Sequence, residues 1–333
     1  MTLGDRLDRL VNLDIGARGI EHLHAAARAR SGAALSMAAA ERLAAVPEGA
    51  VVLATTGSVS RAWISAEIGE NDGPAGLATI CRALALARRA IPVVVAEAAL
   101  LPGIGEILRA AGLALVTLEE ARRTAMPGGR LAVAVLHPYP LEDEAARAAA
   151  GPLLDRLAPA LAFSTERVGR NARGVYHNMR GVDFGMGRAR IDHLFDAALA
   201  RGIPSVAVGD GGNEIGMGLV AAAVAEHIPF GARCACGCGG GLGAITGTDV
   251  LMTAAVSNWG CTAIAAAFAS LERNPALLHT PELEARLLLR GTEVGLINSV
   301  DGIVDPNVDG IPLATHQAVV ELCRQLVLAE LAR

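Results

Sequence analysis

Short apolar segments alternate with alanine-rich helical segments along most of the chain, and this alternation constrains the fold more than any other feature. Seven segments are predicted to be strands: 51–54, 92–96, 113–116, 131–136, 160–163, 204–208 and 250–256. Several are apolar throughout, as expected for parallel strands buried on both faces. Helical patterns lie between them, at 77–89, 103–111, 142–157 and 189–201. The sequence therefore predicts an α/β fold with three layers, a doubly wound, mostly parallel sheet with helices on both faces and right-handed crossovers.

Residues 1–49 contain no strand pattern and carry amphipathic helical patterns, so we expect an N-terminal helical extension packed on the core. Residues 50–333 are predicted to form the α/β domain, which closes with a helix over 315–331. A chain of 333 residues is long enough to bury a sizeable core. No low-complexity linker divides it, although a split near residue 160 is the alternative.

Lysine is absent from the chain, whose 29 basic residues are all arginines. This absence excludes a pyridoxal-phosphate Schiff base and a Walker-type phosphate loop, because both need a lysine. A net charge of −5 without a basic block, and an aromatic content of 3%, argue against a nucleic-acid partner. The sequence shows no signal peptide and no apolar run long enough for a membrane span, so we expect no membrane partner and a cytoplasmic location.

The loop after the predicted strand 204–208 is the leading candidate for an active site, because ligands of open α/β sheets bind beyond the carboxyl ends of strands. From residue 209 it reads Gly-Asp-Gly-Gly-Asn-Glu. Asp210 and Glu214 are candidate catalytic groups, since crowding two carboxylates raises the proton affinity of one, as suits a general base. The backbone of Gly211 and Gly212, together with Asn213, is predicted to bind the substrate. A glycine-rich turn capped by Asn213 is the alternative.

The same loop resembles the acidic loop of haloacid-dehalogenase-type phosphatases. Those enzymes also need a lysine and an early Asp-x-Asp motif after a strand. The chain has no lysine, and no Asp-x-Asp follows a strand in its first half. We therefore set that interpretation aside.

A second polar stretch, 165–183, follows the predicted strand 160–163. Glu166 is a further candidate base, and Arg167 and Arg170 are predicted to hold a substrate carboxylate through paired hydrogen bonds. Tyr176 and Asn178 are predicted to complete the substrate contacts. The alternative is a surface excursion whose charges pair with one another.

Two other strand ends carry candidate residues. Thr56 and Gly57 follow the strand 51–54 and are predicted substrate contacts, and Asn258 follows the strand 250–256 and is placed to donate to a ligand oxygen or to cap a helix. Glu70 and Asp72, with Asp210, are candidate ligands for a divalent metal, while helix capping is the alternative for Asp72. No cofactor is required by these patterns, and a divalent metal stays open.

Cys234, Cys236 and Cys238 form a Cys-x-Cys-x-Cys run. Structural zinc usually takes two separated pairs with a two-residue spacer, and the sequence contains no second pair. Buried or incidental thiols are the favoured interpretation, with a metal site as the alternative. The six cysteines are too few and too unevenly spaced for a disulfide framework in a chain of this length.

Five segments together resemble the D-glutamate cyclase family in its catalytic C-terminal domain. They are Glu-Asn-Asp-Gly-Pro-Ala-Gly at 70–76, Glu-Arg-x-Gly-Arg at 166–170 with Gly-x-Tyr-x-Asn at 174–178, the glycine loop at 209–218, Val-Ser-Asn-Trp-Gly at 256–260 and Val-Asp-Gly-Ile-Pro at 308–312. Two positions depart from the family pattern: Asn71 stands where threonine is usual, and Ala75 where a second proline is usual. The additional N-terminal domain of larger relatives is not part of this sequence.

The resemblance implies an enzyme that cyclises D-glutamate to 5-oxo-D-proline with loss of water, a carbon–oxygen lyase acting on a small acidic amino acid. A hydrolase or lyase acting on another small acidic amino acid or on a lactam would need almost the same site. A non-catalytic sensor of such a ligand would need the arginines and asparagines but no base. A homo-oligomer is left open by the sequence.

Overall fold

The computed structural model describes residues 1–57, 59–124 and 128–333. Its sheet has seven strands in the order β3-β4-β2-β1-β5-β6-β7, and every pairing is parallel. The strands are β1 (Val51–Thr56), β2 (Ile91–Ala96), β3 (Ala114–Leu115), β4 (Val133–Pro138), β5 (Leu161–Thr165), β6 (Ser205–Gly209) and β7 (Val250–Thr253). All seven predicted strands are therefore confirmed, with ends that differ by at most three residues.

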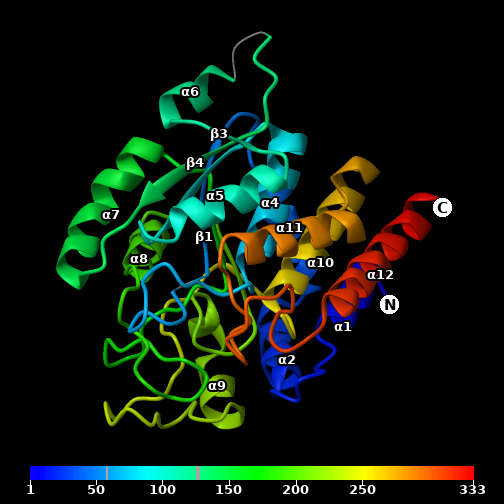
Figure 1. Ribbon diagram of the computed structural model, residues 1–333. Helices are drawn as coiled ribbons and strands as arrows, with labels where there is room; N and C mark the ends of the chain where they lie inside the picture. Colours follow the sequence, from blue (N-terminus) through cyan, green and yellow to red (C-terminus); the bar gives the residue numbers. More distant parts are fainter. Residues whose placement is uncertain (58, 125–127) are drawn as a thin grey trace.

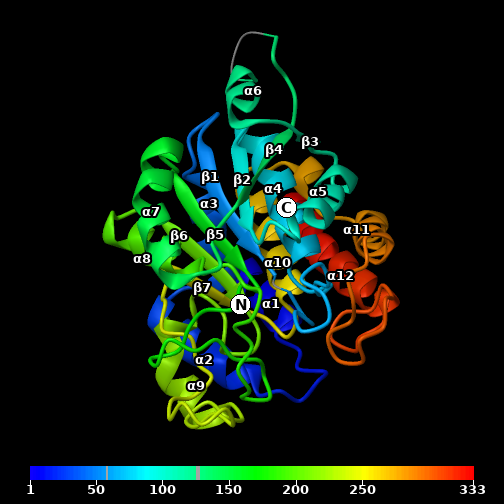
Figure 2. The same cartoon turned by 60° about the vertical axis from the view of Figure 1, so that its left-hand side comes forward.

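Helices cover both faces of the sheet (Figure 2). Alternate strand residues divide between two cores, as a pleated strand requires: Leu53 and Val93 face one core, and Val52 and Val94 face the other. The first core includes α6 (Leu118–Arg123), α7 (Asp143–Leu157) and α8 (Asp192–Ala200). The second includes α3 (Leu35–Ala44), α4 (Pro74–Arg88), α5 (Leu101–Ala110) and α10 (Ser257–Leu271). The predicted three-layer α/β fold is confirmed.

Helix α10 is buried on nearly all sides, because it lies between α3 and α4 on one side and an outer helix on the other. That outer helix is α12 (Leu313–Leu331), which packs beside α11 (Pro281–Glu293). The alanine-rich sequence of α10 lets these neighbours approach closely. The predicted closing helix over 315–331 is confirmed as α12.

Residues 1–49 form three helices: α1 (Leu3–Val11), α2 (Ile20–Ser31) and α3. A capping box between Thr2 and Asp5 begins α1. Helix α1 packs against α10 and α12, and an ion pair of 2.8 Å joins Arg6 to Glu330. The two ends of the chain therefore lie side by side (Figure 1). Helix α2 lies against β7 and α9 (Ala221–His227), so the N-terminal segment reaches the edge of the sheet near the glycine loop.

The four helices predicted between strands are confirmed, with shifted ends. Helix α4 begins earlier than predicted, at Pro74, because proline is well suited to the first helical position. Short helices α6 and α9 were not predicted, since six or seven residues give too few turns for a clear period. None of the helices in 1–57, 59–124 and 128–333 has the length and apolar character needed to cross a membrane.

The connections leaving β1 and β5 diverge. The chain after β1 continues into α4 on one face, and the chain after β5 continues into α8 on the other. The two strands are neighbours, with Thr56 paired to Thr165 at their carboxyl ends. Such a switch point opens a crevice where ligands of doubly wound sheets bind. The candidate site lies there.

Candidate active site

A cavity of about 360 Å³ lies beyond the carboxyl ends of β5 and β6. Its volume falls within the range of about 300–1,000 Å³ that is usual for small-molecule sites. Segments from the whole length of the chain line it: Arg18, Ser60, Arg61, Trp63, Glu70, Glu166, Val168, Asn178, Met179, Arg180, Phe184, Asp210, Asn213, Ser299, Val300 and Asp309. Four of these residues are acids and three are arginines, so the cavity suits a small ligand that carries both signs of charge.

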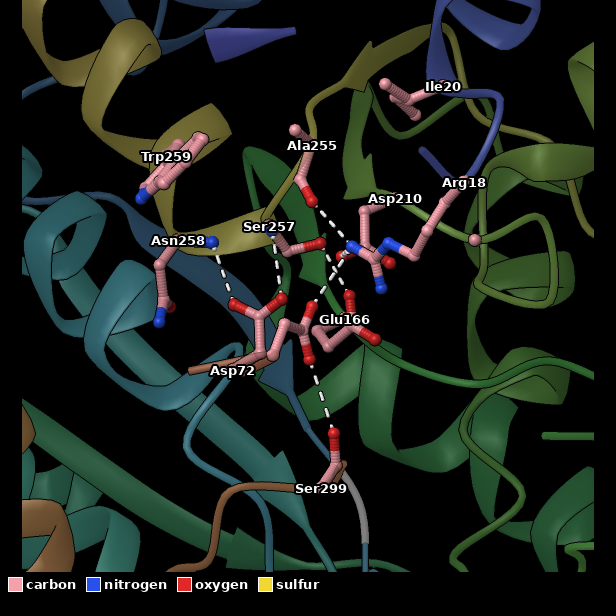
Figure 3. Close-up of polar contacts among 12 residues, drawn as sticks. Arg18, Ile20, Asp72, Glu166, Asp210, Ala255, Ser257, Asn258, Trp259 and Ser299 are labelled. Carbon is pink, nitrogen blue, oxygen red and sulfur yellow. Dashed lines mark hydrogen bonds and ion pairs between the residues drawn. The ribbon is translucent and has the colours of Figure 1, made fainter. Parts of the chain in front are cut away.

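Asp210 follows β6 directly and forms an ion pair with Arg18 of the N-terminal segment. One Nη of Arg18 lies 2.7 Å from a carboxylate oxygen of Asp210 and 3.1 Å from one of Asp309, and it also donates to the backbone oxygen of Ala255 (Figure 3). Burial raises the pKa of Asp210 well above its usual value, Asp309 adds to the increase, and Arg18 opposes it. Arg18 therefore links the extension to the centre of the cavity.

Glu166 follows β5 and lines the cavity. Its backbone is in the left-handed conformation, with φ at 53°. A residue other than glycine in this conformation is strained by about 1–3 kcal/mol, and such strain gathers at functional sites. The Ser257 hydroxyl donates a 2.6 Å hydrogen bond to the Glu166 carboxylate. Burial, followed by repulsion from Asp210 and Glu214, raises the pKa of Glu166 well above its usual value. Glu166 thus holds a proton more readily than an ordinary glutamate does.

Two further carboxyl groups crowd the same place. Burial and the nearby Asp309 raise the pKa of Asp72 to about 7 and that of Glu70 to about 8. The Asp72 carboxylate accepts hydrogen bonds of 2.9 Å from the backbone N–H groups of Ser257 and Asn258, at the start of α10 (Figure 3). Asp72 therefore fastens the segment after β1 to the first turn of α10, and it does not cap its own helix α4.

Glu214 lies beside Asp210 and Glu166 but faces its own loop. Its carboxylate accepts hydrogen bonds of 3.2, 2.8 and 2.8 Å from the backbone N–H groups of Asp210, Gly211 and Gly212. These bonds close the glycine loop and engage the N–H groups that were predicted to bind the substrate. The geometry therefore does not support the predicted anion cradle, and it gives Glu214 the role of holding Asp210 in place.

Arg167 and Arg170 lie outside the cavity, contrary to the prediction that they hold a substrate carboxylate. Arg167 is fully buried and binds both oxygens of Glu97, at 2.9 and 2.6 Å, together with two backbone oxygens. Arg170 binds Asp192 at 2.6 Å and also pairs with Asp196. The Tyr176 hydroxyl donates to the same Asp192, at 2.6 Å. The alternative interpretation, a surface excursion whose charges pair with one another, does not describe them either: their acidic partners lie outside 165–183, Arg167 and Tyr176 are buried, and Arg170 is partly exposed.

Asn258 also lies outside the cavity. Its side-chain oxygen accepts from the backbone N–H groups of Gly73 and Gly76, at 3.0 and 2.7 Å, and its amide group donates to the backbone oxygen of Asn71. Asn258 is therefore not placed on the cavity wall as predicted, and it does not cap α10, because Val256 holds the cap position of that helix. Thr56 and Gly57 are buried at the end of β1 and are absent from the cavity wall described above.

Asn178 and Asn213 do line the cavity, as predicted. Asn178 accepts from the backbone of Arg180 and Val182, which fixes its turn. Asn213 donates a 2.8 Å hydrogen bond to the backbone oxygen of His177. The two loops after β5 and β6 are thereby joined at the cavity wall.

Several cavity residues were not predicted from the sequence. Arg18 lies in a segment treated as an extension, 192 positions from its partner Asp210. Asp309 belongs to the segment 308–312, which carries part of the family pattern but was not a predicted site. Arg61 and Arg180 lie on the cavity wall, and Arg180 is exposed and forms no ion pair within the described part of the chain. The sequence feature that could have indicated Arg61 and Arg180 is their position, since each is an arginine in a loop that follows a strand.

Two groups of carboxylates converge closely enough to hold a metal ion. Asp72, Asp210 and Asp309 each offer an oxygen within 4.8 Å of the others, and so do Glu166, Asp210 and Glu214. The sequence analysis named Glu70, Asp72 and Asp210 as candidate metal ligands, and in the first of these groups Asp309 stands in place of Glu70. Oxygen donors of this kind fit a hard divalent cation such as Mg²⁺ or Mn²⁺.

The fold and the cavity define the class of this protein: a doubly wound α/β protein with a cavity of small-molecule size at its switch point. The family model described as D-glutamate cyclase-like, C-terminal, matches residues 7–324, and the chain belongs to that family. The chain is also similar to the human protein "D-glutamate cyclase, mitochondrial", with 34% identity over 185 residues. That match covers 49% of this chain and 28% of the human protein, so the two share less than a third of the human protein's length. The family inferred from the five motifs is confirmed.

Proposed function

We propose that this protein cyclises D-glutamate to 5-oxo-D-proline and water. The observation that carries the proposal is the group of crowded acids, with raised pKa values at Glu166 and Asp210, around a small cavity at the switch point. Membership of the D-glutamate cyclase-like family supports the choice of substrate. A carboxylate whose pKa is raised accepts a proton more readily than an ordinary carboxylate, and it can return that proton in a later step, as this reaction needs.

The reaction forms one bond and breaks one. The amino nitrogen of the substrate attacks its own γ-carboxyl carbon, a nitrogen–carbon bond forms, and one carbon–oxygen bond of that carboxyl group breaks. Two protons leave the ammonium nitrogen, and both end on the departing oxygen, which leaves as water. No net proton is taken up or released. Since nucleophile and electrophile are tethered, holding the chain bent supplies up to about 7–11 kcal/mol of entropic advantage.

Glu166 is the proposed proton carrier. It lines the cavity, and the Ser257 hydroxyl holds one of its oxygens at 2.6 Å, so the other oxygen can meet the substrate nitrogen. Asp210 is the second candidate, because it lines the cavity and the Arg18 guanidinium at 2.7 Å opposes the increase in its pKa and so favours the ionised form, which can bind the substrate ammonium group. General acid–base catalysis of this kind contributes about 10²–10⁴ in rate. Glu214 acts through the loop that positions Asp210.

The arginines of the cavity are the proposed partners of the two substrate carboxylates. Arg61 and Arg180 lie on its wall, and Arg18 lies among the acids. Neutralising the γ-carboxylate makes its carbon more electrophilic, and the same positive charge stabilises the oxygen on which charge develops. A divalent cation held by Asp72, Asp210 and Asp309 would supply further charge neutralisation at the same place.

Incubation with D-glutamate and, separately, with L-glutamate tests the proposal, with 5-oxoproline measured by chiral chromatography. We expect product from the D-enantiomer, and parallel samples with a chelator show whether a metal ion takes part. Calorimetric binding of D-glutamate without product formation would indicate a sensor and would contradict the proposed activity. The cytoplasmic location stays a prediction, and the name of the human relative places that protein in mitochondria.

A further inference from the structure

A second cluster of reactive side chains lies outside the cavity, in the segment after α9. The thiols of Cys234, Cys236 and Cys238 and the ring of His177 each offer one atom within 4.8 Å of the others. The sulfur of Cys234 lies 3.4 Å from that of Cys236 and 3.3 Å from that of Cys238. The Nε2 atom of His177 lies 3.1 Å from the Cys236 sulfur and 3.9 Å from the Cys238 sulfur. Three sulfurs and one imidazole nitrogen thus surround a common point.

The backbone is shaped to produce this convergence. Gly237 lies between Cys236 and Cys238, and Gly239 follows Cys238. Both glycines have a positive φ, 83° for Gly237 and 77° for Gly239. A side chain at either position would meet nothing within 4 Å, so space is not the reason for glycine there. The left-handed backbone is the reason, since it turns the chain so that Cys236 and Cys238 point the same way.

Packing of buried thiols does not account for the cluster. Cys236 is exposed and Cys238 is partly exposed, so of the favoured interpretation, buried or incidental thiols, burial is wrong for these two. A disulfide would join two of the sulfurs at about 2.05 Å and would leave the third sulfur and the imidazole without a purpose. All six cysteines are free, and the three in this run are 3.3 and 3.4 Å apart along the contacts given above.

We propose that His177, Cys234, Cys236 and Cys238 bind one Zn²⁺ ion in a closed, structural site. Three thiolates and one imidazole are a usual tetrahedral set for structural zinc, at about 2.3 Å for sulfur and about 2.0–2.1 Å for nitrogen. Those bond lengths place neighbouring donor atoms about 3.5–3.8 Å apart, close to the separations seen here. Soft sulfur donors favour zinc over Mg²⁺ or Mn²⁺, so this site differs in kind from the carboxylate groups of the cavity.

Outer groups support the thiolate form. The Asn171 side-chain amide donates to the Cys238 sulfur at 3.4 Å and to the backbone oxygen of Gly241 at 2.7 Å. Stabilising a thiolate in this way prepares a metal ligand and orients it.

The zinc ion would tie the Cys-rich segment to the wall of the cavity. The backbone N–H groups of Ala235 and Cys236 donate to the oxygen of Gly181, at 2.8 and 3.1 Å. The backbone oxygen of His177 accepts from Asn213 of the glycine loop. The Cys-rich segment would therefore hold both ends of the turn 177–181: His177 through the metal, and Gly181 through these backbone hydrogen bonds. Asn178 and Arg180 of this turn line the cavity. This inference does not rest on the proposed function.

Metal analysis of the full chain, purified without a histidine tag and without chelator, tests the site. We expect about one zinc ion per chain by plasma mass spectrometry. A mercurial thiol reagent added to the native wild-type protein should release that zinc, which needs no variant and so does not depend on a variant folding. Replacement of zinc by cobalt should give the intense near-ultraviolet absorption of thiolate–cobalt bonds.

Matched variants locate the ion. C236S and C238S should each lose zinc and the cobalt absorption. C323S, which alters a buried cysteine of α12, and D72N, which alters the carboxylate cluster, should both keep them. The proposal is overturned by wild-type protein that contains no zinc and gives no cobalt–thiolate band, or by zinc that stays in both C236S and C238S. A disulfide within the run in freshly purified protein, with no bound metal, would overturn it as well.

Discussion

The buried pair of Arg167 and Glu97 makes the sharpest prediction about stability. The exposed fractions of the two side chains are 0% and 2%. The Arg167 guanidinium makes two bonds to Glu97 and one each to the backbone oxygens of Gly57 and Ala189, so it joins the carboxyl ends of β1, β2 and β5. Removing one partner of such a pair leaves a buried charge alone and costs about 3–5 kcal/mol. We expect R167M to lower the free energy of unfolding by that amount.

A double-mutant cycle in urea separates this pair from a role in substrate binding. E97Q should also destabilise the protein, and the R167M/E97Q double variant should cost less than the sum of the two singles by about 0.5–3 kcal/mol, because the second change removes the stranded charge. The slope of unfolding free energy against urea should stay constant across the cycle. Additive costs, or an R167M protein of normal stability whose KM for substrate is raised, would refute the structural role and restore the carboxylate-binding one.

Three further predictions concern the cavity. D210N should keep the fold and lower kcat by about 10²-fold or more, and unchanged turnover in a protein of normal circular dichroism would remove Asp210 from the mechanism. R18M should destabilise the fold by about 1–3 kcal/mol in urea, because the buried acceptors on Asp210 lose their donor, and equal stability would show that Arg18 is dispensable. The pKa of Glu70 is raised to about 8 from 4.5, so the folded chain holds this proton more tightly than the unfolded chain. Its contribution to stability is therefore full below about pH 4.5 and is lost as the pH rises towards 8, and E70Q should gain stability relative to wild type across that window by at most about 1.4 kcal/mol per pH unit. If the difference in unfolding free energy between E70Q and wild type does not change with pH, in thermal or urea unfolding, the raised pKa of Glu70 is contradicted.

The strands and the switch point could be predicted from the sequence because they depend on local pattern. Buried parallel strands are continuous apolar runs, and each ends where polar residues and glycines begin. That is why the loops carrying Glu166 and Asp210 were found correctly at strand ends, where the cavity lies.

The direction in which each polar side chain points could not be predicted in the same way. Arg167, Arg170 and Tyr176 occupy a strand-end loop, yet their partners Glu97 and Asp192 lie 70, 22 and 16 positions away. Pairing over such separations depends on the folded topology, and the sequence of one loop does not contain it. The polar stretch 165–183 was therefore predicted to be a site throughout. In the structure some of its residues line the cavity, and the others pair with acidic residues outside the cavity.

The same limit explains why the proposed zinc site was not predicted from the sequence. The Cys-x-Cys-x-Cys run supplies three donors in sequence, and the fourth, His177, lies 59 and 61 positions from Cys236 and Cys238. A search for a second cysteine pair misses a single histidine on another loop. Arg18 was missed for the same reason, since nothing in the pattern of residues 1–49 indicates that one of its side chains enters the cavity.

Carbon NMR of D-glutamate labelled at the γ-carboxyl carbon tests the central claim most directly, with wild type and E166Q followed side by side. The amide that E166Q introduces keeps the size of the side chain and an oxygen for the Ser257 hydroxyl, but it cannot carry the proton. The proposal predicts that the carboxylate signal gives way to a lactam carbonyl signal with wild type, and at a rate lowered by about 10²–10⁴ with E166Q. No lactam from the wild-type protein, or equal rates from the two proteins, would contradict it.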